Sequence, residues 1–372
     1  MVTNPFRPTF GTSPPVLAGR REHTASFADS LDAGPGAPGR ATLYTGARGV
    51  GKTVMLNAAE DVARERGWIV ISETASPGIV HRLVHDHLPG ALALVTGSRE
   101  HARVSGLTAP AGLGAISVER VPPVHRPERS LRNQLTDLAS VTAAHGAGVL
   151  ITVDEIHGGD VGELRELAVT VQHCFRSDLD VAFAAAALPA AVASLLNDRV
   201  LTFLRRAERH DLGPLSRGES ALAIVGPIRS VGLDITPEAL DLIVDASGGY
   251  PFMVQLVGFH TLRNRPERRL IDADDAVRGI TAARRRLGHL VVEPELQALS
   301  SGDRRFLSAM AVDDGPSRTA DIARRLGVSG PYAGQYRLRL LAAGVITAPK
   351  YGWIDFAIPG VREHLRRTET HG

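Results

Sequence analysis

The sequence of 372 residues lacks several features that define particular classes of protein. Its single cysteine, Cys174, excludes an internal disulfide and leaves no partner thiols for a zinc site of the Cys-x-x-Cys kind. No run of about 18 apolar residues occurs, which excludes a membrane-spanning helix. Residues 1–20 have no continuous apolar stretch of the secretory kind. We therefore expect a cytoplasmic protein without a membrane partner.

Lysine is also nearly absent, because only two of the 42 basic side chains, Lys52 and Lys350, are lysines. Lys52 falls in a glycine-rich motif, at a position that suits a compact, flexible ammonium better than a planar guanidinium. Where almost every other cation is arginine, a lysine at this position indicates a chemical requirement.

The apolar periodicity predicts an α/β core. Short β-favouring runs alternate with helical patterns, which is typical of a parallel, doubly wound sheet. The expected strands are residues 41–45, 68–72, 149–153 and 181–187. After Pro189 the pattern becomes wholly helical, beginning with an expected helix at 201–207.

The length exceeds that of one ordinary domain, so several are expected. We predict an N-terminal extension at 1–16, an α/β core at 17–200, a helical lid at 201–295 and a C-terminal domain at 296–372. Residues 91–128 lose periodicity apart from a short β-favouring stretch at 115–118, and we interpret them as an insertion in the core.

A phosphate-binding motif lies between the first expected strand and the helix that follows it. Its glycines allow a tight loop whose backbone N–H groups point at phosphate, at the positive end of a helix dipole. Lys52 is expected to reach the β and γ phosphates, and the Thr53 hydroxyl to bind Mg²⁺. The expected nucleotide-binding residues are Gly46, Ala47, Arg48, Gly49, Val50, Gly51, Lys52 and Thr53.

Two adjacent carboxylates, Asp154 and Glu155, follow the apolar strand at 149–153. Ligands of open α/β sheets bind at the carboxyl ends of the strands, so these side chains are expected beside the phosphates. Asp154 suits the Mg²⁺ shell, and Glu155 suits a catalytic role in activating water. The two motifs predict an ATPase that converts ATP and water to ADP and phosphate, with ATP and Mg²⁺ as ligands.

These motifs, the lead-in at residues 17–22 and a Gly-Tyr-Pro element at 249–251 together resemble AAA ATPases of origin-recognition type and the related STAND signalling ATPases. The resemblance covers about residues 15–290. It implies that Gly19 and Arg20 neighbour the adenine, and that Pro251 begins a lid helix facing the nucleotide.

The sequence departs from this family pattern at two places. A polar residue usually ends the strand after the paired carboxylates, but residues 183–189 offer none, and a sensor arginine in the lid has no clear counterpart. The family can also hold an arginine that reaches the nucleotide of a neighbouring subunit. Arg209 is the catalytic candidate for that role, with Arg205 and Arg206 nearby, which implies a homo-oligomer. The alternative is that these arginines lie on a solvated helix face.

The C-terminal segment resembles winged-helix DNA-binding domains over residues 303–367. Helices are expected at 303–311, 319–326 and 332–342, and strands at 345–348 and 353–357. Residues 261–372 carry 19 Lys and Arg against 13 Asp and Glu, which permits a nucleic-acid role. We predict contact with double-stranded DNA through residues 319–353, with these candidates: Tyr332, Gln335, Tyr336, Arg337, Arg339, Lys350 and Tyr351.

The sequence thus predicts an AAA-type P-loop core, a helical lid and a winged helix, acting as an ATP-controlled DNA-binding factor. The alternative is a STAND-like signalling switch, with slow or no hydrolysis, whose winged helix binds protein.

Overall fold

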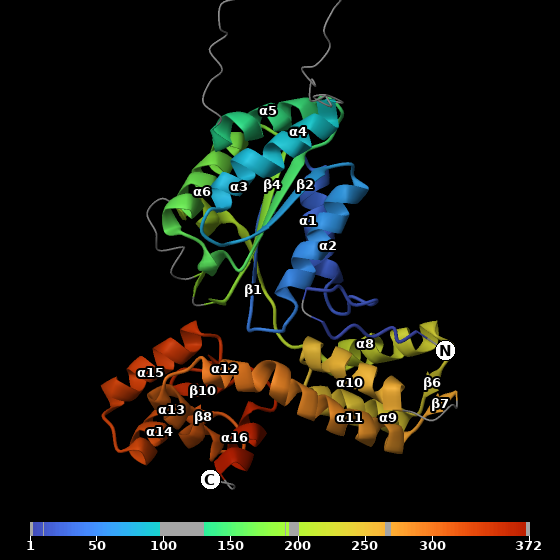
Figure 1. The fold of residues 1–372 in the computed structure, drawn as a ribbon, viewed down its shortest axis with the longest axis vertical. Coiled ribbons are helices and arrows are strands. Elements are labelled where there is room, and N and C mark those ends of the chain that lie inside the picture. Colours follow the sequence, from blue (N-terminus) through green and yellow to red (C-terminus); the bar gives the residue numbers. More distant parts are fainter. Residues whose placement is uncertain are drawn as a thin grey trace, which may run out of the picture.

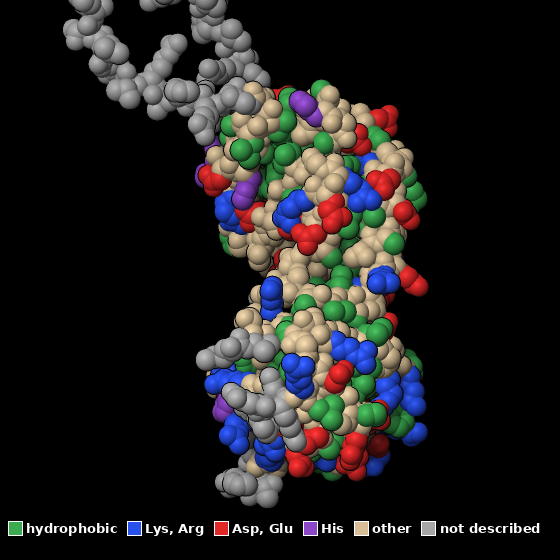
Figure 2. Space-filling view, turned by 90° about the vertical axis from the view of Figure 1, so that its right-hand side faces the viewer, with side chains coloured by type: hydrophobic (Ala, Val, Ile, Leu, Met, Phe, Trp, Pro, Cys, Tyr) green, Lys and Arg blue, Asp and Glu red, His purple; other side chains and the backbone are tan. Residues whose placement is uncertain are grey.

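The computed structural model describes residues 3–9, 11–96, 130–189, 191–192, 201–264 and 269–369. The molecule has two lobes joined by a narrow waist (Figure 2). The α/β core forms one lobe, and the lid and the C-terminal region lie side by side in the other (Figure 1). The β-favouring stretch predicted at 115–118 lies outside the described residues.

The core is a five-stranded parallel sheet in the order β2-β3-β4-β1-β5. Four of its strands match the predicted ones. The strands are β1 (Ala41–Thr45), β2 (Ile69–Thr74), β3 (Val149–Asp154), β4 (Val181–Ala187) and β5 (Glu208–Asp211).

Strands β3 and β4 lie inside the sheet and are buried on both of its faces, to which successive side chains point in turn. Leu150 and Ala184 face α1 (Arg21–Asp32) and α2 (Lys52–Glu65), whereas Ile151 and Phe183 face the opposite layer. That second layer contains α3 (Ile79–Arg82), the π-helix η1 (Leu83–His87), α4 (Leu88–Thr96), α5 (Leu131–Ala143), the short η2 (Ile156–Gly158) and α6 (Val161–Arg176).

Strand β5 corrects the prediction that the chain from Pro189 through the lid is wholly helical. Its sequence, Glu-Arg-His-Asp, has no apolar run, so it becomes a strand only by pairing with β1, where Leu43 lies opposite Arg209. A 3₁₀ helix, η3 (Leu201–Arg206), precedes it in place of the helix expected at 201–207. The core sheet therefore continues beyond residue 200, where the lid was predicted to begin.

Four helices form the lid, and polar residues cap three of them at the N-terminus. Ser216 and Glu219 make a capping box on the first, and Asp272 and Asp275 make one on the last. The helices are α8 (Arg217–Ser230), α9 (Pro237–Ser247), α10 (Pro251–Asn264) and α11 (Ala273–Leu287), with a small pair of strands, β6 (Asp234–Ile235) and β7 (Leu270–Ile271).

The C-terminal region follows the π-helix η4 (Gly288–Val292) and α12 (Glu293–Gln297). It contains the three predicted helices and both predicted strands, with two further elements, β8 and α16. Its elements are α13 (Ser301–Ala311), β8 (Ser317–Arg318), α14 (Thr319–Leu326), α15 (Gly330–Ala342), β9 (Ile346–Thr347), β10 (Trp353–Phe356) and α16 (Val361–Glu369). Strand β10 pairs antiparallel with both β8 and β9. Within the described ranges, no helix is long and apolar enough to cross a membrane.

Candidate functional site

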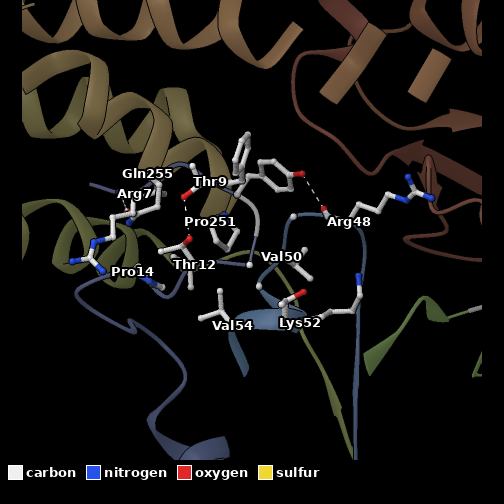
Figure 3. A pocket seen from close by; sticks show the side chains of 18 of the residues that line it. Arg7, Thr9, Thr12, Pro14, Arg48, Val50, Lys52, Val54, Pro251 and Gln255 are labelled. Carbon is white, nitrogen blue, oxygen red and sulfur yellow. Dashed lines mark hydrogen bonds between the residues drawn. The ribbon is translucent and has the colours of Figure 1, made fainter. Parts of the chain in front are cut away.

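A cavity of about 510 Å³ lies between the core and the lid. Its wall comes from parts of the chain that are far apart in the sequence (Figure 3). The core contributes residues 48–54 and Glu155, the lid contributes residues around Tyr250–Gln255 and 290–295, and the N-terminal residues before α1 form another side. The cavity therefore has the size and composition of a small-ligand site.

The loop between β1 and α2 has the conformation that its glycines permit. Gly46, Gly49 and Gly51 have φ angles of 152°, 74° and 98°. A Cβ at Gly46 would lie 2.5 Å from the Leu212 carbonyl oxygen, and one at Gly49 would lie 2.0 Å from the Tyr250 hydroxyl. At Gly46 and Gly49, side chains are excluded both by the backbone conformation and by the close approach of neighbouring segments.

Lys52 is held inside this loop. Its Nζ donates to the carbonyl oxygens of Gly46 and Ala47, both at 3.1 Å, and the residue is only 5% exposed. Burial lowers the pKa of Lys52, while the carboxylates of Glu155 and Asp154 oppose that shift. The ammonium thus lies where the loop and two acidic groups converge.

Thr53 and Asp154 meet although 101 positions separate them in the chain. The Thr53 hydroxyl donates to Asp154 Oδ2 at 2.6 Å, and Asp154 Oδ1 accepts from the Glu155 backbone N–H at 2.8 Å. A hydroxyl and a carboxylate at this spacing are oxygen ligands of the type that Mg²⁺ prefers. The described residues include no group of three or more His, Cys, Asp or Glu side chains that could hold a metal ion without further ligands.

Glu155 adopts a left-handed backbone conformation, with φ 50° and ψ 42°, which is uncommon for a residue other than glycine. Its carboxylate lies 3.0 Å from the Nε2 atom of His157. Glu155 therefore lines the cavity but is turned toward a histidine on η2.

The end of β4 carries no polar side chain, as the sequence predicts. Ala187 and Leu188 are buried, and Leu188 lies beside Gly344 of the C-terminal region, where a Cβ would approach its Cδ2 atom to 3.0 Å. The C-terminal region therefore packs against the core at the strand beside Asp154.

The remaining predicted nucleotide neighbours have different positions. Arg20 and Pro251 line the cavity. Arg20 donates to the Gly213 carbonyl oxygen at 2.7 Å and to that of Val50 at 3.4 Å, and burial lowers its pKa. Gly19 does not line the cavity. It has φ 67° and faces Glu219, whose carboxylate would be 2.5 Å from a Cβ there.

The structure does not bring Arg209 to the cavity. It is exposed on the edge strand β5, neither on a helix nor among the lining residues. Arg205 and Arg206 are exposed on η3.

The sequence interpretation missed two residues that touch the phosphate loop, Tyr250 of the lid and Glu295 of α12. The Tyr250 hydroxyl donates to the Arg48 carbonyl oxygen at 2.9 Å, and Glu295 of α12 forms an ion pair with the Arg48 guanidinium. Tyr250 stands between Gly249 and Pro251, where only the proline was assigned a role. No sequence motif around Glu295 predicts its ion pair with Arg48, because that contact depends on the packing of α12 over the loop.

Comparisons with known proteins agree with this geometry. Residues 16–177 match the family described as AAA ATPase domain, and residues 290–365 match a domain of unknown function (DUF8462). No curated protein matches the chain.

Two solved structures resemble nearly the whole chain. The Walker-type ATPase of Pyrococcus abyssi is 18% identical, with a TM-score of 0.64 over 94% of this chain and 96% of its own. The ORC2 protein of Aeropyrum pernix, in ADPNP and ADP complexes, is 14% identical, with a TM-score of 0.60 over 98% of each chain. At these identities the likeness concerns the fold. Residues 16–177 thus match an AAA ATPase domain, and the resemblance to origin-recognition-type ATPases is confirmed in the fold of the chain.

Proposed function

We propose that this protein binds ATP with Mg²⁺ between core and lid, hydrolyses it to ADP and phosphate, and thereby controls DNA binding by its C-terminal region. The observation that carries the nucleotide proposal is that Lys52 and Thr53 lie on one wall of the cavity, with Asp154 hydrogen-bonded to the Thr53 hydroxyl. The neighbour from Aeropyrum pernix was solved with nucleotides, which adds support.

The residues of the loop have separate tasks in this proposal. The backbone N–H groups of residues 46–53 would surround the phosphates, and Lys52 would exchange the Gly46 and Ala47 carbonyls for phosphate oxygens. Thr53 and Asp154 would hold Mg²⁺, which neutralises phosphate charge when bound. Glu155 would have to leave His157 before it could accept a proton from water. We expect slow turnover, because β4 offers no polar group to hold that water.

We propose that residues 296–372 form a winged helix, with the second and third helices at α14 and α15 and the wing between β9 and β10. We also propose the domain division predicted from sequence, except that the core extends through β5 to Asp211 before the lid begins.

The charge distribution of the C-terminal region supports the DNA proposal. Five of its aspartates form ion pairs with arginines, in the pairs Asp303–Arg339, Asp313–Arg325, Asp314–Arg366, Asp321–Arg324 and Asp355–Arg362. Within the described part of the chain, other cations have no carboxylate within ion-pair distance: Arg304, Arg305, Arg318, Arg337 and Lys350. These unpaired charges lie on α13, β8, α15 and the wing, a distribution that suits phosphate contacts.

The contacts also narrow the set of predicted DNA-binding side chains. Tyr336 stacks on Phe306, with ring centroids 5.9 Å apart, and Arg339 is paired with Asp303. Both side chains therefore make contacts inside the C-terminal region. Lys350, over the Trp353 ring, and the fully exposed Tyr351 are better placed to meet a duplex.

The test is fluorescence anisotropy of a labelled DNA duplex, with protein loaded with ADP or with a non-hydrolysable ATP analogue, between about 50 and 200 mM salt. We expect affinity to fall with salt and to differ between nucleotides. Lys350→Ala should weaken binding and reduce the salt slope by about 1. Arg324→Ala is the matched control, because Asp321 already neutralises that exposed arginine. Absence of salt-dependent binding in both nucleotide states would refute the DNA proposal.

A STAND-like signalling switch is the second candidate, and the packing of Gly344 on Leu188 favours it. In that case the C-terminal region would rest on the core until nucleotide releases it toward a protein partner. The two candidates differ in the anisotropy test, since only the first requires DNA affinity.

We retain Arg209 as a proposed catalytic arginine acting in trans. Because it is exposed on the sheet edge, it would have to serve the cavity of a second copy of the chain. Light scattering with ATP should then show an oligomer, and Arg209→Ala should reduce hydrolysis without reducing ATP affinity. A monomer under turnover conditions would exclude this role.

A further inference from the structure

We infer that residues 4–9 and 11–14, which we call the N-terminal strap, hold the lid to the core across the nucleotide cavity and control the release of nucleotide. This inference rests on the proposed nucleotide function. The match to the AAA ATPase domain begins at residue 16, so the strap lies outside the region that the match covers.

One end of the strap is fixed to lid helix α10. Phe6 is only 2% exposed and fills the space beside Gly258, where a Cβ would lie 2.4 Å from the phenyl ring. Asn4 donates its side-chain amide to the Phe259 carbonyl oxygen at 2.9 Å. The Arg7 backbone N–H donates to Gln255 Oε1 at 3.2 Å. The glycine in α10 thus makes a notch that a larger residue would close.

The other end of the strap is fixed to core helix α2. Asn57 donates its side-chain amide to the Gly11 carbonyl oxygen at 2.8 Å and to Ser13 Oγ at 3.3 Å. Gly11 also lies beside Thr53, with 3.8 Å between the position of a Cβ and the threonine methyl group. The strap therefore joins the lid to the helix that begins with the phosphate-binding residues.

Between these anchors the strap forms a wall of the cavity. Its lining residues are Arg7, Thr9, Gly11, Thr12 and Pro14. Figure 3 shows Thr9, Thr12 and Pro14 on the side of the pocket opposite Lys52 and Arg48. The hydroxyls of Thr9 and Thr12 are hydrogen-bonded to each other at 3.1 Å and can exchange that bond for a ligand.

This placement assigns the strap to the nucleoside end of the ligand. With the phosphates at Lys52, the ribose and base extend toward Val54, Pro251 and the strap. The strap forms hydrogen bonds with both the core and the lid. A nucleotide enclosed behind it therefore leaves only after the contacts with α10 or those with α2 have broken. The contacts that hold the strap should therefore affect the dissociation rate of the nucleotide more than its association rate.

The structure offers a selective way to open the lid anchor. Gly258→Ala places a methyl group where the Phe6 ring lies, at a helix position where alanine is intrinsically favoured over glycine. The matched control is Gly218→Ala in lid helix α8, because no atom lies within 4 Å of a Cβ there. Phe6→Ala is a second variant that removes the anchor from the other side.

The experiment measures release of radiolabelled ADP after a chase with unlabelled ADP, because a fluorophore on the ribose would collide with the strap. Hydrogen exchange of the N-terminal peptide is followed in parallel. We expect faster exchange and at least about tenfold faster ADP release in Gly258→Ala and Phe6→Ala. Gly218→Ala should stay within about twofold of wild type.

The possible results distinguish failure of the inferred role of the strap from failure of the proposed nucleotide binding. If the strap exchanges faster but ADP leaves at the wild-type rate, the inference is overturned and nucleotide binding stands. If neither variant changes exchange or release, the strap is not anchored as inferred and the inference is also overturned. If the wild-type protein does not retain ADP, both the proposed nucleotide binding and the inference about the strap are refuted.

Discussion

Substitution of Lys52 by methionine should lower the affinity for nucleotide without lowering the stability of the ligand-free protein. Lys52 is buried and donates to two carbonyl oxygens of its own loop. In the proposed complex it would instead make charge-assisted hydrogen bonds to phosphate, each worth about 1.5–3 kcal/mol. Loss of two such bonds amounts to about 3–6 kcal/mol, a decrease in affinity of about 10²–10⁴-fold.

The same substitution should not destabilise the ligand-free protein. Burial lowers the pKa of Lys52 more than Glu155 and Asp154 raise it, so the folded state disfavours the charged lysine. Because the pKa is lowered on folding, the charged lysine costs stability at neutral pH, and methionine removes that cost. We expect a thermal unfolding midpoint equal to or above that of wild type without nucleotide, and no increase when ATP is added.

Isothermal titration calorimetry and thermal unfolding, each with and without Mg²⁺ and ATP, measure the two effects. Lys350→Met is the control, because it removes the only other lysine, at an exposed site over Trp353. It should leave nucleotide affinity unchanged. Near-wild-type affinity in Lys52→Met would refute the placement of the phosphates. Marked destabilisation without ligand would refute the argument from burial.

Three further variants test other parts of the molecule. Glu155→Gln should retain ATP binding and release phosphate more slowly than wild type, and equal rates would remove Glu155 from the catalytic role. Tyr250→Phe deletes the hydroxyl that donates to the Arg48 carbonyl, a bond of about 1 kcal/mol, so ADP affinity should fall about fivefold by calorimetry. A hydrogen bond with Arg325 lowers the pKa of Asp313 to about 2 from 3.8. The ionised Asp313 therefore contributes to the free energy of unfolding above about pH 4, and this contribution is lost as pH falls toward 2. Asp313→Asn should therefore cost about 1 kcal/mol of unfolding free energy at pH 7 and almost nothing at pH 2, by chemical denaturation.

Elements whose signals are local can be predicted from the amino-acid sequence alone. The glycines at 46, 49 and 51 fix the loop because the required φ angles are positive, and the runs at 149–153 and 181–187 are apolar enough to predict strands buried on both faces. From two motifs about 100 residues apart, we also predicted which side chains would lie together at the sheet edge. The Thr53 to Asp154 contact follows from the parallel order of the strands.

Elements whose stability depends on distant partners become evident only in the folded chain. Strand β5 is polar and exists by pairing with β1, so Arg209 lies on an exposed sheet edge and not on the solvated helix face of the alternative interpretation. Residues 1–16 were predicted to be an extension, yet Phe6 occupies a notch at Gly258 that no local pattern reveals. Likewise, Tyr250 and Glu295 reach Arg48 only because the lid and α12 pack over the loop. Backbone preference and periodicity act over a few residues, whereas these contacts join positions at least 166 residues apart, and only the folded chain brings them together.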